Sequence, residues 1–324
     1  MIEPIRYKKQ SISKKVFESF FKECNGYNQS HTEIETSPVW SRVISNHTGK
    51  EVFDAIESKD INRLKSLYED YYIYGISEGA SSGKALTNNT KYRVNKSKRN
   101  IGRVEPLSKH FNLDTNEPTE VYRHLYQKFN VPKEINIGQT WGWQYNNNFV
   151  HFELADYLYF LDVTIKIMNE YELSKTMFIG DGSGLLSCLL YNNFDVDSSS
   201  HIDLAHLLLR QYINNFHCKT DVKHYYAESF DKNLKHDTQI VINQDSLPEM
   251  KSESVEKYVD NIDMNNVPFI LSYNIENGTS FNPHHSDYRG ILKSRGYQGV
   301  WRLDSTVRPP YVIELFYKGE NDDT

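Results

Sequence analysis

Apolar positions follow two different patterns along this chain, and the change comes near its middle. In the first part, apolar residues recur at helical spacing, which predicts helices over residues 16–24, 54–74 and 120–129. From residue 152 onward, short apolar runs alternate with helical segments. Strands are expected at 177–179, 201–203, 222–226, 238–243, 267–273, 299–303 and 311–317, and helices at 152–171, 185–193, 204–216, 252–261 and 288–294.

The alternation of strands and helices predicts an α/β fold with a mostly parallel sheet. The last two strands have no helix between them, so we expect an antiparallel final strand at one edge. The change of pattern also predicts a division of the chain. Residues 1–135 would form a mainly helical N-terminal region, which could cover a substrate or mediate self-association, and residues 136–324 would contain the sheet.

Composition narrows the class of protein. The 324 residues include 37 Lys and Arg against 43 Asp and Glu, a formal charge of −6, which gives no general attraction to nucleic acid or anionic membranes. Three widely spaced cysteines suggest neither a disulfide framework nor a zinc site, and no spacing of acidic and histidine residues predicts another metal site. No apolar run is long enough for a membrane span, so we expect a cytoplasmic protein.

Residues 177–187 (MFIGDGSGLLS) carry the clearest functional signal. An apolar run ends in Gly180, Gly182 and Gly184, and a leucine-rich helical segment follows at once. Glycine tolerates a positive φ and lets the backbone approach a ligand closely. A strand, a tight turn and a helix in this order place a ligand over the helix N-terminus at the carboxyl edge of the sheet. The segment therefore predicts a site for a nucleoside-type cofactor.

Two cofactors fit such a turn. Asp203, at the end of the second predicted strand, is placed to accept hydrogen bonds from two ribose hydroxyls, which both NAD and S-adenosylmethionine require. The dinucleotide pattern G-x-G-x-x-G needs a third glycine where this chain has Ser187. The spacing of the three glycines instead favours S-adenosylmethionine.

Three segments in order resemble a family of sugar O-methyltransferases, within the Rossmann-like class of S-adenosylmethionine-dependent methyltransferases. These are residues 178–186 (FIGDGSGLL), 202–212 (IDLAHLLLRQY) and 242–250 (INQDSLPEM). The resemblance extends from about residue 141 to 318 and involves little of the first 135 residues. One position departs from the class: Phe178 stands where an acidic residue usually helps to hold the methionine end of the cofactor.

The resemblance implies a methyl transfer from S-adenosylmethionine to a sugar hydroxyl by in-line displacement, within a glycan, a nucleotide sugar or a related glycoconjugate. It also implies that the cofactor contacts lie in the glycine turn and after the next three strands. The residues expected there are Gly180, Asp181, Gly182, Ser183, Gly184, Asp203, Leu204, Glu228, Ser229, Asn243 and Gln244.

A sugar hydroxyl is a poor nucleophile, so a general base is expected at the carboxyl edge of the sheet. Asp245 and Glu249 follow the fourth predicted strand, and His284 and His285 follow the fifth. We favour the histidine pair because histidine titrates nearest neutrality, with Asp245 to orient or replace it. An equally ordinary role for one of two adjacent histidines is to cap a turn.

Two further features have both a functional and a structural interpretation. Trp141 and Trp143 could form an aromatic wall for the sugar or the cofactor, or pack under a loop. Residues 84–103 contain seven basic and no acidic residues, and could contact a phosphate or form a solvated loop. The alternatives for the whole protein are a methyltransferase-like binding module without turnover, favoured by Phe178, and an NAD-dependent dehydrogenase.

Overall fold

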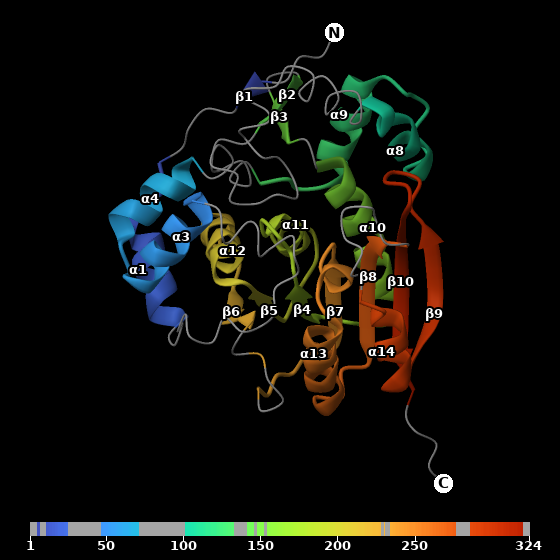
Figure 1. Ribbon diagram of the computed structural model, residues 1–324. Helices are drawn as coiled ribbons and strands as arrows, with labels where there is room; N and C mark the ends of the chain where they lie inside the picture. The colour runs from blue at the N-terminus through green and yellow to red at the C-terminus, as the bar shows by residue number, and fades with distance from the viewer. Residues whose placement is uncertain are drawn as a thin grey trace.

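The computed structural model describes residues 5–6, 11–24, 47–70, 101–132, 141–145, 148–151, 154–227, 230, 234–276 and 286–319. In this part of the chain, an N-terminal set of helices is followed by an α/β unit (Figure 1). The N-terminal helices are α1 (Lys14–Glu23), α3 (His47–Glu57), α4 (Ile61–Glu69), α8 (Val104–His110) and α9 (Pro118–Lys128).

Seven of the described strands form one sheet in the order β6-β5-β4-β7-β8-β10-β9. They are β4 (Lys175–Ile179), β5 (Ser198–Asp203), β6 (Val222–Tyr226), β7 (Ile240–Gln244), β8 (Phe269–Ile275), β9 (Tyr297–Asp304) and β10 (Tyr311–Lys318). Strands β4, β5, β6, β7 and β8 of this sheet pair in parallel. The final strand, β10, runs antiparallel to β8 on one side and to β9 on the other.

This arrangement confirms the predicted fold class. Numbered one to seven in chain order, the strands lie across the sheet in the order 3-2-1-4-5-7-6, with an antiparallel seventh strand, which is the Rossmann-like methyltransferase arrangement. A dinucleotide-binding sheet of the type that dehydrogenases use has the order 3-2-1-4-5-6 with parallel strands. The insertion of β10 between β8 and β9 therefore disfavours the dehydrogenase alternative.

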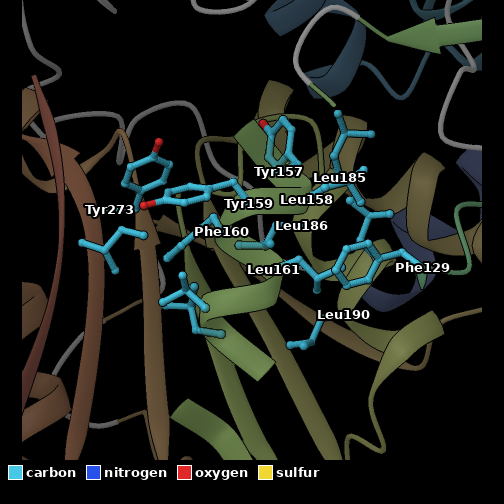
Figure 2. Packing of buried hydrophobic residues seen from close by; sticks show 14 of the residues in the cluster. Phe129, Tyr157, Leu158, Tyr159, Phe160, Leu161, Leu185, Leu186, Leu190 and Tyr273 are labelled. Carbon is cyan, nitrogen blue, oxygen red and sulfur yellow. The ribbon is translucent and has the colours of Figure 1, made fainter. Parts of the chain in front are cut away.

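Helices cover both faces of the sheet (Figure 1). They are α10 (Leu154–Glu170), α11 (Leu185–Asn193) and α12 (Ala205–Cys218) on one face, and α13 (Ser252–Met264) and α14 (Tyr288–Ser294) on the other. The largest apolar cluster lies between α10, α11 and the central strands. Figure 2 shows part of it, including Leu186 of α11, Phe160 of α10 and Tyr273 of β8. The ring centroids of Phe160 and Tyr273 are 4.9 Å apart.

The N-terminal helices share their apolar cores with the α/β unit. Side chains of α1, α3 and α4 pack with Leu208, Leu209 and Ile213 of α12 in one cluster. Side chains of α8 and α9 join the cluster around α10. The buried contacts therefore cross the predicted boundary between residues 135 and 136, and the division into two regions remains a prediction.

A buried carboxylate joins α8 and α9 to α10. Asp162 of α10 lies 2.9 Å from His110 Nε2 of α8 and 2.8 Å from Lys128 Nζ of α9. Lys166, one turn further along α10, is 2.7 Å away. Burial acts to raise the pKa of Asp162, but hydrogen bonds from these three groups, the strongest from His110, together outweigh it and lower that pKa. The charged carboxylate thus holds three helices at one point.

The structure corrects the sequence prediction in a few places. The helix predicted at 54–74 is divided in its described part between α3 and α4, because Lys59 adopts a left-handed φ of 53° and Asp60 caps α4 through Arg63 N. Helix α8 was not predicted. A small sheet of β1 (Ile5–Arg6), β2 (Trp141–Tyr145) and β3 (Asn148–His151) was also missed. None of the helices in the described ranges combines the length and apolar character that a membrane crossing requires.

Candidate functional site

The turn between β4 and α11 needs its three glycines for different reasons. Gly180, Gly182 and Gly184 have φ values of 74°, 56° and 75°. A Cβ on Gly180 would lie 2.2 Å from Ser246 Cβ, and one on Gly184 would lie 2.9 Å from Gln211 Cα. A Cβ on Gly182 would meet nothing within 4 Å. The outer glycines thus permit the protein's own packing, whereas Gly182 faces open space that a ligand could approach.

The side chain of Asp181 turns away from that open space. Its carboxylate is buried and accepts hydrogen bonds from Leu186 N at 3.2 Å and Ser187 N at 3.1 Å. Burial raises the pKa of Asp181 to about 7, although these hydrogen bonds oppose the change. Asp181 therefore caps the first turn of α11. A contact between this residue and a cofactor stays a prediction.

Asp203 ends β5, next to the glycine turn. Strands β4 and β5 are parallel neighbours, with Ile179 opposite Ile202. The Asp203 side chain accepts hydrogen bonds from Leu204 N at 2.8 Å and from Gln211 Nε2 at 2.6 Å. Each carboxylate oxygen can accept a second hydrogen bond. The placement of Asp203 thus suits a ribose-binding role, and Leu204 beside it is half-buried at the start of α12.

Helix α12 holds the turn through amide side chains that we did not predict as site residues. Gln211 Nε2 lies 3.3 Å from the carbonyl oxygen of Gly182, and Asn214 Nδ2 donates to the carbonyl of Ser183. Gln211 Oε1 is 2.9 Å from His201 Nδ1. Gln211 lies within the second segment of the family resemblance, which was the available signal. Helical periodicity alone does not separate such a residue from a solvent-facing one.

The last residues of β7 and those just after it border the other side of the turn. Asn243 is fully buried, donates to Ile179 O at 2.7 Å and accepts from Asn274 Nδ2 at 2.8 Å. It therefore ties the end of β7 to β4 and β8. Gln244 is also buried, but its Oε1 has no hydrogen-bond partner among the described residues, and the same holds for Ser246 Oγ. These two oxygens are therefore buried acceptors without a described partner.

Asp245 is fixed by Tyr273 of β8 and by Arg308 in the turn before β10. It adopts a left-handed φ of 55°, and its backbone N–H donates to Tyr273 O at 3.2 Å. Its carboxylate accepts a hydrogen bond from Arg308, whose guanidinium lies 3.8 Å from the centre of the Tyr311 ring. The Asp245 side chain is 31% exposed, so it remains accessible at the carboxyl edge of the sheet. Glu249 is half-buried in the short 3-10 helix η4 (Leu247–Glu249).

Several predicted site residues lie outside the described residues. They are Glu228, Ser229, His284 and His285. The backbone of Trp141 and Trp143 belongs to β2, but nothing is described of their side chains. The roles of all six residues stay predictions. In the described part of the chain, no three His, Cys, Asp or Glu residues come together as a metal site would require.

Phe178 faces the helices and not the turn. It is buried in the cluster with Leu186 and Leu189 of α11, and its ring centroid is 5.1 Å from that of His201. An acidic side chain at this position would lie in an apolar environment, where its charged form is disfavoured. The departure from the family pattern is therefore consistent with the local packing.

Comparisons with known proteins give partial matches in structure alone. No protein-family model matches the sequence, and no relative is found among curated proteins. The magnesium protoporphyrin IX methyltransferase from Synechocystis, with bound S-adenosylhomocysteine, is 13% identical with a TM-score of 0.41; the match covers 53% of this chain and 89% of that one. The N-methyltransferase NodS from Bradyrhizobium japonicum is 12% identical with a TM-score of 0.40, covering 51% and 88%.

A third structure, the methyltransferase domain of a bacterial Hen1 protein, is 10% identical with a TM-score of 0.38. The match covers 48% of this chain and 96% of that domain. About half of this chain is thus similar to each of the three structures. The assignment to the Rossmann-like methyltransferase fold rests on the strand order and on the antiparallel final strand.

Proposed function

We propose that this protein is an S-adenosylmethionine-dependent O-methyltransferase that acts on a sugar hydroxyl. One observation carries the cofactor assignment. Gly182, whose added Cβ would face open space, and the carboxylate of Asp203 are both hydrogen-bonded to the Gln211 amide, at the carboxyl edge of a sheet with the methyltransferase strand order. Ligands of α/β sheets bind at this edge, near the first strand–helix turn.

The residues around the turn fit the parts of this cofactor. Asp203 would accept hydrogen bonds from the ribose hydroxyls. The unpartnered oxygens of Gln244 and Ser246 would accept hydrogen bonds from the amino group of the methionine portion. Gly182 leaves room for the cofactor at the turn. Because Phe178 is packed inward, these neutral oxygens would replace the acidic side chain that the class usually has there.

When bound, S-adenosylmethionine supplies an electrophilic methyl group. The protein must orient the acceptor hydroxyl, exclude water and take up the hydroxyl proton. Asp245 and Glu249 are the described candidates for the base, beside the predicted His284 and His285. The carboxylate of Asp245 is bonded to Arg308, so Arg308 fixes its position while leaving it accessible. This geometry favours Asp245 as the group that orients the hydroxyl or its base.

Two observations support a sugar acceptor: the three-segment resemblance, and the charged side chains at the carboxyl edge of the sheet beyond β7. Asp245, Glu249 and Arg308 offer charged hydrogen-bonding groups there, which suit a hydroxyl-rich ligand. The binding-module alternative shares the same cofactor site and differs only in turnover. It is favoured by the absence of the usual acidic residue at Phe178.

Calorimetry and a methyl-transfer assay test the proposal in turn. We expect S-adenosylhomocysteine to bind at one site per chain, and methyl transfer to at least one member of a panel of nucleotide sugars and glycans. Loss of a general base costs roughly 10²–10⁴-fold in rate. Asp245→Ala, His284→Ala and His285→Ala should therefore separate the base from its neighbours.

Each result has a distinct meaning. Full activity in all three variants would discard the base assignment and leave the cofactor assignment intact. Binding without transfer to any acceptor would favour the module. The absence of any heat with S-adenosylhomocysteine would contradict the proposal as a whole.

A further inference from the structure

The amide of Gln211 joins the two cofactor-binding elements of the proposed site. Gln211 is fully buried on α12. Its Nε2 lies 2.6 Å from Asp203 Oδ2 and 3.3 Å from the carbonyl oxygen of Gly182. One side chain thus contacts both the carboxylate after β5 and the turn after β4. The backbone of α12 also lies against Gly184 at the same residue.

The chemistry of its partners fixes how this amide points. The ionised Asp203 carboxylate and the Gly182 carbonyl are acceptors only, so the amide nitrogen must face them. The amide oxygen then faces His201 Nδ1 at 2.9 Å, and that nitrogen must carry a proton. Burial lowers the pKa of His201 to about 4, so the ring is neutral near neutral pH. His201 therefore holds Gln211 in one orientation.

We propose that Gln211 is a positioning residue for cofactor binding, which holds the ribose-binding carboxylate of Asp203 at a set distance from the glycine turn. The inference rests on the proposed function, since it concerns the same cofactor site. Neither Asp203 nor Gly182 can move alone without breaking a buried hydrogen bond to Gln211. The free protein is then already arranged for the ligand, which reduces the ordering cost of binding.

A substitution with a titratable isostere tests this role. In Gln211→Glu, a second carboxylate would stand where the amide nitrogen now contacts Asp203. Two carboxylates at that separation cannot both be charged, so the pair would share one proton, and one of the two pKa values would rise. In the wild-type protein, burial lowers the pKa of His201 to about 4 and lowers the pKa of His224 well below its ordinary value. Lowering the pH should therefore rebuild a hydrogen bond between the introduced carboxyl group and Asp203 in this variant only.

The matched control lies at the opposite edge of the sheet. Gln239 Oε1 accepts hydrogen bonds from Ser174 N at 2.8 Å and Lys175 N at 3.1 Å, beside the amino ends of β4 and β7. Gln239→Met and Gln211→Met each remove one amide that bonds to backbone. Only Gln211→Met should weaken the affinity for the ligand.

The measurement is the affinity for S-adenosylhomocysteine by calorimetry, relative to wild type at the same pH, at about pH 8 and about pH 5.5. A lost buried hydrogen bond to a charged group corresponds to roughly a 10-fold to 100-fold weaker affinity. We expect Gln211→Glu to lose about 100-fold at the higher pH and to regain most of that loss at the lower pH. Gln211→Met should lose about 10-fold at both, and Gln239→Met less than about 2-fold.

A double-mutant cycle with Asp203→Ala adds a second readout. If Gln211 acts through Asp203, Gln211→Met should weaken binding less in the Asp203→Ala background than in wild type. Wild-type affinity in Gln211→Met, equal losses in both backgrounds, or no recovery of Gln211→Glu at low pH would overturn the inference and leave the proposed function standing. No binding by the wild-type protein would overturn both.

Discussion

Helix α11, which follows the glycine turn, lies between an apolar environment on one side and buried amides and histidines on the other. Toward α10, the contacts come from leucine, phenylalanine and tyrosine side chains (Figure 2). Toward α12, the buried residues include His201, Gln211, Asn214 and Asn215. Apolar packing is non-directional and stabilises the fold, whereas hydrogen bonds fix distances and orientations. The comparison suggests that the α10 side supplies stability and the α12 side sets the geometry of the site.

The most severe test of the α12 side is Gly184→Val. The new side chain would meet Gln211 Cα at about the 2.9 Å found for an added Cβ, and a β-branched residue would have to adopt a φ of 75°. We expect the variant to lose about 4 kcal/mol or more of its free energy of unfolding. Urea denaturation followed by circular dichroism measures this.

Gly182→Ala is the matched control, because nothing lies within 4 Å of its added Cβ. It should cost only about 1–2 kcal/mol through its left-handed φ, while still weakening S-adenosylhomocysteine binding. Equal stability losses in Gly182→Ala and Gly184→Val would show that α12 does not constrain the turn.

The pH dependence of stability tests Asp181, which lies within the turn. Its pKa is raised by burial from 3.8 to about 7, so between these values the folded state binds more protons than the unfolded state. Stability from this group is therefore full below about pH 4 and is lost as the pH rises toward 7. The free energy of unfolding should fall by up to about 1.4 kcal/mol per pH unit in that window.

Asp181→Asn should lack this decline, so the comparison is between the two pH profiles from urea denaturation. Subtracting the profiles removes the titration of all other groups. Parallel profiles for wild type and variant would mean that Asp181 is charged in the folded protein throughout.

On the α10 side, Leu161→Ala should reduce stability without changing the site. Leu161 is fully buried in the cluster around α10, and such a truncation costs about 3 kcal/mol. We expect the affinity of the folded protein for S-adenosylhomocysteine to stay within about 2-fold of wild type, because no hydrogen bond of the turn is touched. Calorimetry well below the unfolding temperature measures the affinity of the folded protein separately from its free energy of unfolding. A large loss of affinity would contradict the division between the two sides.

Asp203→Ala, in contrast, should weaken ligand binding. It removes the proposed ribose contact and one partner of Gln211, so the affinity for S-adenosylhomocysteine should fall about 100-fold, or about 2.7 kcal/mol. Asp197→Ala is the matched control, since Asp197 is exposed just before the amino end of the same strand. Affinity unchanged in both variants would remove Asp203 from the site.

The sequence was sufficient for the sheet because its signals are local. Short apolar runs, the three glycines and the final strand pair each depend on a few neighbouring residues. Helix α8 was missed because it has only seven residues and contains a proline, and the break at Lys59 interrupts an apolar pattern that otherwise continues. The strands of the small sheet are too short for their period to be recognised.

The candidate site was only partly predictable for a different reason. Position after a strand predicted that Asp203 and Asp245 lie at the carboxyl edge. It could not predict that Arg308, over sixty residues later, contacts Asp245, or that Gln211 contacts Gly182. It also could not show that Asp181 turns toward α11. These contacts depend on the tertiary arrangement of elements that are separate in the sequence.

The ion pairs at Asp162 have a practical consequence for anyone who would shorten this protein. Cutting the chain after residue 135 would remove His110 and Lys128, and would leave a carboxylate on α10 with Lys166 as its remaining described cation. The apolar side chains of α10 that α8 and α9 cover would become exposed to water at the same time. We expect such a fragment to aggregate on expression more than the intact polypeptide does.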